Sequence, residues 1–342
     1  MLVLNFFFML NPKKVKIAVV TGGAGFIGSH MVDYLLNKNF KVRVIDNLKG
    51  GRLTNLQQHS KNKMLSFSRI DIRKCKVSNT IFKDVDVIFH FAGIGDIVPS
   101  IEKPLEYMDV NNQGTVQLLE CARLNKIPSF IYAASSSCYG IAKVPTSESH
   151  EINTKYPYAL SKYLGECSVF HWGKVYGLNI NSIRIFNAYG TRSRTSGAYG
   201  AVFGVFLKQK LSDKPLTIVG DGKQKRDFLY VTDVCAAFYK VYTSKCKNEI
   251  YNLGAGKPQS INKLVRLLRV KKIVYIPKRP GEPSCTWANI NKIKKKTGWK
   301  PEVSFEEGVK KIIDNISYWK NSPLWDPNSI KKATKTWFEH LK

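Results

Sequence analysis

The feature that most constrains the fold of this chain is a glycine-rich turn between a strand-like segment and a helix-like segment. Residues 16–20 form a short apolar run, and apolar residues recur at helical spacing over 26–36. Glycines at this point permit a tight turn, let backbone amides approach a pyrophosphate and allow the helix to pack closely on the sheet. The turn therefore predicts a dinucleotide site. Its candidate contact residues are Gly22, Gly25, Phe26, Ile27 and Gly28.

An acidic residue lies where a second contact to the dinucleotide is expected. Asp46 follows Gly28 by 18 residues, directly after the strand-like run 41–45. A carboxylate at this point holds both hydroxyls of an adenosine ribose and repels a 2′-phosphate. Asp46 therefore favours NAD over NADP as the cofactor, although Arg43 and Arg52 are near enough in sequence to leave NADP open.

Strand-like and helix-like segments continue to alternate through the first half of the chain. Buried-strand patterns occur at 85–91 and 130–134, and a helical pattern at 114–122 lies between them. Such alternation is typical of an α/β protein in which helices cover both faces of a parallel sheet. We therefore expect a Rossmann-type, doubly wound parallel sheet.

The alternation weakens after Ile185, which indicates a second, smaller unit. Residues 190–200 are expected to form a mobile loop, and residues 252–299 to contain one further helix. The predicted division is an N-terminal extension over 1–12, an NAD-binding domain over 13–190 with 225–252, and a C-terminal substrate-binding lobe over 191–224 with 253–342.

Composition narrows the class of protein. With 342 residues and 44% hydrophobic content, the chain can bury a large core. Its seven cysteines form no C-x-x-C pair and have no histidine at metal-ligand spacing, so we expect no metal site and no disulfide framework. A reducing cytoplasm fits this pattern best.

Charge and the N-terminal segment exclude two other classes. The net charge of +29 would attract polyanions, but the lysines are spread along the chain without a nucleic-acid module, so no nucleic-acid partner is expected. Residues 1–10 are apolar but too few to span a bilayer, and they lack the charged start and cleavage site of a signal peptide. We expect no stable membrane insertion, and either an over-extended start codon or a membrane-touching tail would explain the segment.

The run Thr21–His30 resembles the opening of the extended short-chain dehydrogenases/reductases, in particular the sugar-nucleotide epimerases, and the likeness continues to Trp299. The resemblance implies NAD as cofactor and a nucleoside-diphosphate sugar as substrate. It also implies that Asp71 and Ile72 lie beside the adenine, and that Asn111 belongs to a helix that braces the active site.

Two residues in one helical segment predict an acid–base pair. Tyr158 and Lys162 are four residues apart, which places both side chains on one face of a helix. A tyrosine has a pKa near 10, and an adjacent ammonium together with a positive nicotinamide would bring that pKa toward neutrality. Tyr158 is therefore the candidate proton acceptor, and by resemblance Lys162 also holds the nicotinamide ribose.

A serine cluster follows the strand-like run 130–134. By resemblance Ser135 takes the place of the family's catalytic hydroxyl, and Ser136 and Ser137 either contact substrate or cap the loop. Related 4,6-dehydratases carry an Asp-Glu pair after this hydroxyl, since removal of water needs a further acid and base. Related decarboxylases carry a glutamate at the position of Ser137.

The absence of these acids favours NAD-dependent epimerisation at carbon 4 of a nucleoside-diphosphate hexose through a transient 4-keto intermediate. Two rivals stay open at this point: a net reductase or dehydrogenase that uses the same three residues, and a non-catalytic dinucleotide- or nucleic-acid-binding protein.

The resemblance also implies a substrate-binding set and a homodimer. Arg226 and Arg279 would hold the diphosphate because a guanidinium fork matches two phosphate oxygens. Thr286 would gate the pocket for the sugar's 2-substituent, and a small side chain there would admit both plain and N-acetylated hexoses. A one-residue slip would put Cys285 at the gate instead. The expected substrate-binding residues are Ser136, Ser137, Asn187, Arg226, Arg279, Glu282 and Thr286.

Overall fold

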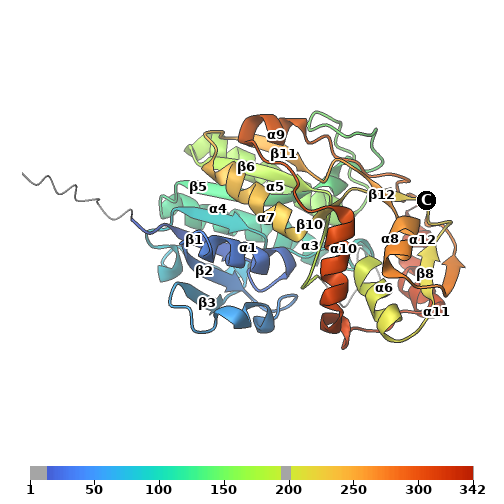
Figure 1. Cartoon of the computed structure of the whole chain (residues 1–342). Helices are drawn as coiled ribbons and strands as arrows, with labels where there is room; N and C mark the ends of the chain where they lie inside the picture. The colour runs from blue at the N-terminus through green and yellow to red at the C-terminus, as the bar shows by residue number, and fades with distance from the viewer. Residues whose placement is uncertain (1–13, 194–201, 342) are drawn as a thin grey trace, which may run out of the picture.

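The computed structural model describes residues 14–193 and 202–341, and its centre is a seven-stranded sheet in which every neighbouring pair of strands is parallel. The spatial order is β11-β6-β5-β4-β1-β2-β3 (Figure 1). The strands span Ile17–Thr21 (β1), Lys41–Asp46 (β2), Leu65–Arg69 (β3), Val87–His90 (β4), Ser129–Ser135 (β5), Asn179–Ile185 (β6) and Glu249–Leu253 (β11). The predicted Rossmann-type sheet is confirmed.

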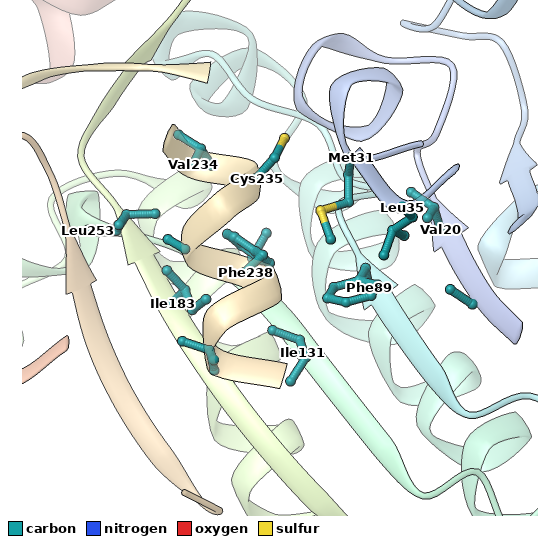
Figure 2. Packing of buried hydrophobic residues seen from close by; sticks show 14 of the residues in the cluster. Val20, Met31, Leu35, Phe89, Ile131, Ile183, Val234, Cys235, Phe238 and Leu253 are labelled. Carbon is teal, nitrogen blue, oxygen red and sulfur yellow. The ribbon is translucent and has the colours of Figure 1, made fainter. Parts of the chain in front are cut away.

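Helices cover both faces of this sheet because side chains alternate along each strand. Val20 and Phe89 pack toward α1 (Phe26–Leu36) and α7 (Val231–Thr243), whereas Val19 packs toward the opposite layer. Figure 2 shows the first layer, with the side chain of Phe238 of α7 over the sheet. The opposite layer consists of α4 (Gly114–Leu124) and α5 (Pro157–Tyr176).

The strand order reverses at β1, since β2 lies on one side of it and β4 on the other. In sheets of this kind, ligands bind beyond the carboxyl ends of the strands at such a switch point. The residues that end these strands or follow them directly include Gly22, Asp46, His90 and Ser135. The topology therefore gathers the predicted cofactor and catalytic residues at one edge of the sheet.

A second lobe, to the right in Figure 1, has a separate aromatic core. Tyr189 stacks on Phe203 with ring centroids 4.8 Å apart, and Phe228 stacks on Phe305 at 5.3 Å. The elements that contribute to this lobe are β7 (Asn187–Tyr189), α6 (Val202–Leu211), β8 (Leu216–Val219), β9 (Lys225–Arg226), β10 (Phe228–Tyr230), β12 (Gln259–Ser260), α8 (Ile261–Leu268), β13 (Ile273–Ile276) and α10 (Phe305–Asp314).

One expectation about this region is wrong. Residues 252–299 contain two helices, α8 and α9 (Asn291–Thr297), rather than one. The second is easily missed because it is lysine-rich and buries only Ile293, so its apolar periodicity is weak. The predicted extension 1–12 and most of the predicted loop 190–200 lie outside the described residues. No helix among the residues described is long and apolar enough to cross a membrane.

Candidate active site

The glycine turn forms a cradle in which there is no room for side chains at two positions. A Cβ on Gly22 would lie 2.8 Å from the backbone nitrogen of Ala92, and Gly22 also has a φ of +68°. A Cβ on Gly28 would lie 2.1 Å from the carbonyl oxygen of Gly22. The turn therefore packs against the loop after β4 and against the start of α1 too closely for any residue but glycine, which is the packing that glycine-rich dinucleotide-binding turns require.

The first turn of α1 completes this cradle. Gly25 is the residue before the helix, and its amide donates to the carbonyl oxygen of Gly22 at 3.0 Å. The amides that open a helix have no partner within it, so those of Phe26 and Ile27 are in place to meet an anion. Their side chains pack on the core of the second lobe, which fixes the start of α1.

Asp46 lies at the end of β2 and is buried. Its two carboxylate oxygens accept from the amide of Ala24 at 3.0 Å and from the amide of Leu48 at 2.8 Å. Burial raises the pKa of Asp46, and these two hydrogen bonds oppose the rise. Asp46 thus braces the glycine turn besides offering the carboxylate that a ribose would meet.

The structure places Asp71 and Ile72 just beyond β3, with one residue between Asp71 and the end of the strand at Arg69. The Arg73 guanidinium donates to the Asp71 carboxylate at 2.9 and 2.7 Å and holds the pKa of that carboxyl well below its usual range. Asn47 donates to the same carboxylate at 3.0 Å. The side chain of Ile72 is buried beneath Gly114 of α4. The adenine contact predicted for this pair stays a prediction.

The three predicted catalytic residues lie together at the carboxyl edge of the sheet. The Tyr158 hydroxyl donates to the Ser135 oxygen at 3.3 Å, and the Ser135 and Ser137 hydroxyls are 2.5 Å apart. Ser135 ends β5, while Tyr158 and Lys162 lie in the first part of α5, which begins at Pro157. A strand end and a helix start therefore present two hydroxyls to one point.

The pKa of Tyr158 is shifted in the direction opposite to the one that the sequence predicts. Lys162 is buried, its ammonium lies 4.3 Å from the centroid of the Tyr132 ring, and burial lowers its pKa to about 7 although Glu166 opposes this. Burial also raises the pKa of Tyr158, while the Ser135 hydroxyl opposes that rise. The expected lowering of the tyrosine pKa is therefore outweighed by desolvation in the protein alone.

Asn111 joins the catalytic helix to the turn after β4. Its amide group donates to the Ser161 hydroxyl at 2.9 Å and to the carbonyl oxygen of Ile94 at 3.0 Å, and its side-chain oxygen accepts from the Ile94 amide at 2.8 Å. Asn111 belongs to a π-helical turn over Asp109–Gln113, a feature frequent at functional sites. This geometry matches the bracing role that the resemblance implies.

The predicted substrate residues form two clusters. Thr286 donates to the side-chain oxygen of Asn187 at 2.7 Å. Glu282 accepts from Arg226 at 2.6 Å and lies 3.9 Å from a guanidinium nitrogen of Arg279. Both arginines and Glu282 are half-buried, so two guanidinium groups meet at one carboxylate in this cluster.

The family described as GDP-mannose 4,6 dehydratase matches residues 19–312. The chain belongs to this family. The match confirms the expected relation to extended short-chain dehydrogenases/reductases, and it covers both the glycine turn and the serine–tyrosine pair.

Similar proteins include several 4-epimerases. The UDP-glucuronate 4-epimerase of Thermodesulfobacterium geofontis is 33% identical over 310 residues, which cover 86% of this chain and 94% of that protein. A solved UDP-N-acetylglucosamine 4-epimerase from Methanobrevibacter ruminantium M1, in complex with UDP-N-acetylmuramic acid, is 32% identical with a TM-score of 0.82 and covers 88% of this chain and 99% of that chain. The UDP-glucuronic acid 4-epimerase from Bacillus cereus, in complex with UDP-glucuronic acid and NAD, is 33% identical with the same TM-score and coverage.

Sequence reasoning about this dehydratase-family chain misses one buried ion pair behind the catalytic residues. Glu166, one turn after Lys162, pairs with Arg184 of β6 and accepts from the Ser182 hydroxyl at 2.7 Å. Arg184 also donates to the Tyr139 hydroxyl at 2.7 Å. The four-residue spacing from Tyr158 through Lys162 to Glu166 is the one signal that could have drawn attention to it.

Proposed function

We propose that this protein is an NAD-dependent 4-epimerase of nucleoside-diphosphate hexoses, with UDP-glucose/UDP-galactose or the N-acetyl forms as substrates. The observation that carries the proposal is the Tyr158–Ser135 hydroxyl pair, 3.3 Å apart, at the edge of the sheet that also carries the glycine cradle. The similarity to epimerases for three UDP-sugar substrates supports the same chemistry.

The glycine turn fits a dinucleotide because Gly22 and Gly28 let the turn and helix α1 pack more closely than a Cβ would allow, while buried Asp46 suits an unphosphorylated ribose. NAD bound there would supply reversible hydride transfer at carbon 4 of the sugar. Phe26 and Ile27 would hold the pyrophosphate by their amides, Gly25 would let it approach the turn closely, and Asp71 with Ile72 would contact the adenine.

Tyr158 would take the proton of the 4-hydroxyl, and Ser135 would donate a hydrogen bond to the same oxygen. The charge of Lys162, on the same face of α5, would favour the phenolate form of Tyr158, and its ammonium would hold the nicotinamide ribose. After the keto sugar turns over, Tyr158 would return the proton. One residue therefore serves as base and as acid, which suffices for epimerisation.

The second lobe would hold the nucleotide. Arg226 and Arg279 would bind the diphosphate, Glu282 would accept from the nucleotide ribose, and Asn187 would contact the sugar diphosphate. Ser136 and Ser137 would line the sugar pocket beside Ser135, and Thr286 would border the 2-substituent. The 2.7 Å hydrogen bond between Thr286 and Asn187 favours Thr286 over Cys285 for that position.

The family's name raises dehydration as an alternative reaction. Dehydration would need an acid and a base after Ser135, and the chain has Ser136 and Ser137 there. Serine hydroxyls are too weakly acidic and too weakly basic to supply both groups at neutral pH. The same positions favour epimerisation over decarboxylation, because the glutamate of related decarboxylases is replaced by Ser137.

Two further proposals concern assembly and compartment. Leu124 at the end of α4 and Val175 and Tyr176 at the end of α5 expose apolar surface, which favours a homodimer through these helices. The seven cysteines are unpaired, which favours a reducing cytoplasm. Sedimentation of the wild type and of Val175→Glu tests the dimer: a monomeric wild type would contradict it.

The test of the proposed reaction is incubation of the purified protein with a panel of UDP-sugars, with no cofactor added and products identified by NMR. We expect interconversion of 4-epimers, and a parallel reaction with added NADH should show no stoichiometric NADH oxidation. Tyr158→Phe should retain bound NAD and lose about 10³-fold in turnover, because only the proton acceptor is removed. Turnover that consumes NADH would establish a reductase, and loss of the 6-hydroxyl would establish a dehydratase.

A further inference from the structure

The segment 313–341 follows the part of the chain that the family matches, and its last helices lie beside the second lobe in Figure 1. It contains a 3₁₀ turn over Ile316–Trp319, α11 (Pro327–Ala333) and α12 (Lys335–His340). Trp319 and Ile330 are buried in the core of the second lobe. The segment is therefore anchored on the lobe that carries the proposed substrate residues.

The last helix of this segment packs against the first domain. Trp337 of α12 is 4% exposed and packs with Val98 of α2 (Ile97–Glu102). Thr336 donates to the carboxylate of Glu102 at 3.0 Å. Helix α2 directly follows the turn after β4 that Asn111 braces. One short helix thus bridges the two halves of the active site.

Trp337 also holds the loop that carries the arginine cluster. Its indole nitrogen donates to the carbonyl oxygen of Pro280 at 2.7 Å. Pro280 lies between Arg279 and Glu282, and the next residue, Gly281, has a φ of +67° with the carbonyl oxygen of Leu341 3.5 Å from where its Cβ would be. The conformation of this loop therefore depends on contacts with the C-terminal segment.

The ring of Tyr156 lies next to both Trp337 and the catalytic Tyr158. The centroids of Trp337 and Tyr156 are 6.4 Å apart, and those of Tyr156 and Tyr158 are 6.4 Å apart with nearly parallel planes at 7°. Tyr107 packs edge-on against the other side of Tyr158 at 6.3 Å. Trp337 thus packs near Tyr156, which stacks on the proposed proton acceptor, and also contacts the loop that would hold the diphosphate.

We propose that Trp337 is a positioning residue, which fixes the loop 279–282 relative to Tyr158 so that a bound sugar nucleotide presents carbon 4 to the catalytic hydroxyls. The inference rests on the proposed function of the site. A displacement of about 1 Å between the loop that would bind the diphosphate and the reacting carbon can lower the rate about 10²-fold. A residue that fixes this loop relative to Tyr158 would therefore increase the rate of the reaction.

The test compares Trp337→Ala, Trp337→Phe and a control, Phe338→Ala, in the NAD-loaded full-length protein. Phe338 is the next residue in α12 and is 39% exposed, so its truncation leaves the brace intact. Trp337→Ala should raise the Kd of UDP-glucose, measured by titration calorimetry, about tenfold. It should also lower kcat at saturating substrate about 10²-fold. Trp337→Phe keeps the packing but loses the Pro280 hydrogen bond. Its Kd and its kcat should both lie between those of the wild type and those of Trp337→Ala.

NAD affinity and melting temperature separate positioning from a merely structural role. If Trp337→Ala lowers both while the Kd of UDP-glucose stays within twofold of the wild type, the inference is wrong. An equal increase in Kd for Phe338→Ala would also overturn it. Failure of the proposed function looks different: the wild type would bind UDP-glucose without epimerising it, and the binding comparison would still decide the role of Trp337.

Discussion

Replacing Lys162 by methionine is expected to make the protein more stable and inactive. The Lys162 ammonium is buried, and burial lowers its pKa from an ordinary 10.5 to about 7. Below about pH 7 the folded protein must therefore keep a poorly solvated charge that the unfolded chain exposes to water. Methionine has a similar length and no charge, so Lys162→Met removes this penalty.

The size of the effect follows from the two pKa values. At about 1.4 kcal/mol per pH unit, the interval between 10.5 and about 7 corresponds to roughly 5 kcal/mol of destabilisation below pH 7. The variant loses the contact between the ammonium and the Tyr132 ring, worth about 2 kcal/mol when desolvated. We therefore expect Lys162→Met to raise the free energy of unfolding by about 3 kcal/mol at pH 6.

The sign of the pH dependence is a second constraint. Between pH 7 and 10.5 the unfolded chain binds more protons at this residue than the folded protein, so wild-type stability rises with pH in that window. The advantage of Lys162→Met should accordingly be largest below pH 7 and shrink as the pH approaches 10.5. Turnover should be lost throughout, since no ammonium supports the Tyr158 phenolate.

Urea denaturation of both proteins, free of dinucleotide, at pH 6, 8 and 9.5 measures these differences. Lys174→Met, at an exposed position of the same helix, serves as the matched control and should change the free energy of unfolding by less than about 0.5 kcal/mol. A less stable Lys162→Met variant, or a gain that does not vary with pH, would refute the argument that this lysine is retained against its cost in stability.

Three further changes test other parts of the site. Asp46→Asn should reduce the preference for NAD over NADP about 10- to 100-fold in dinucleotide titrations, and an unchanged preference would mean that Asp46 only braces the turn. Glu166→Gln should lower the free energy of unfolding by about 3 kcal/mol, because it leaves Arg184 buried without its carboxylate; a neutral result in urea denaturation would contradict this. Thr286→Tyr should abolish activity on UDP-N-acetylglucosamine and spare UDP-glucose, whereas an unchanged ratio of kcat/KM would remove Thr286 from the gate.

The sequence predicts the first domain well because each of its signals is local. The glycine turn, the strand before it and the helix after it lie within 16–36, and Asp46 ends the next strand. A short-range pattern of this kind predicts both the strand–turn–helix unit and the ligand site, because the ligand binds at the turn between strand and helix. The parallel sheet and its two helical layers followed from repetition of the same pattern.

The parts that sequence reasoning missed depend on contacts between distant residues. Glu166 and Arg184 lie on different elements, and the spacing that draws attention to Glu166 does not identify Arg184 as its partner. Helix α9 has too little apolar surface to show a period, because it packs only through Ile293. The role of Trp337 depends on contacts with Pro280 and Val98, at 57 and 239 residues' separation, so its spacing carries no signal.

The directions of the pKa shifts of Tyr158 and Lys162 also could not be predicted from the sequence. The i, i+4 spacing placed Tyr158 beside Lys162, but the depth at which both lie decides the sign of their pKa shifts. Charge patterns in sequence report which groups are neighbours, whereas desolvation depends on the whole fold around them.

The most direct test of the central claim follows one atom through the reaction. UDP-glucose carrying deuterium at carbon 4 is incubated with the enzyme and an excess of unlabelled NAD, and the UDP-galactose formed is examined by mass spectrometry and NMR. An epimerase that returns the hydride within one active site gives product that retains the deuterium at carbon 4, with none in the NAD pool. Product without the label, or label accumulating in free NADH, would contradict the proposed 4-epimerase.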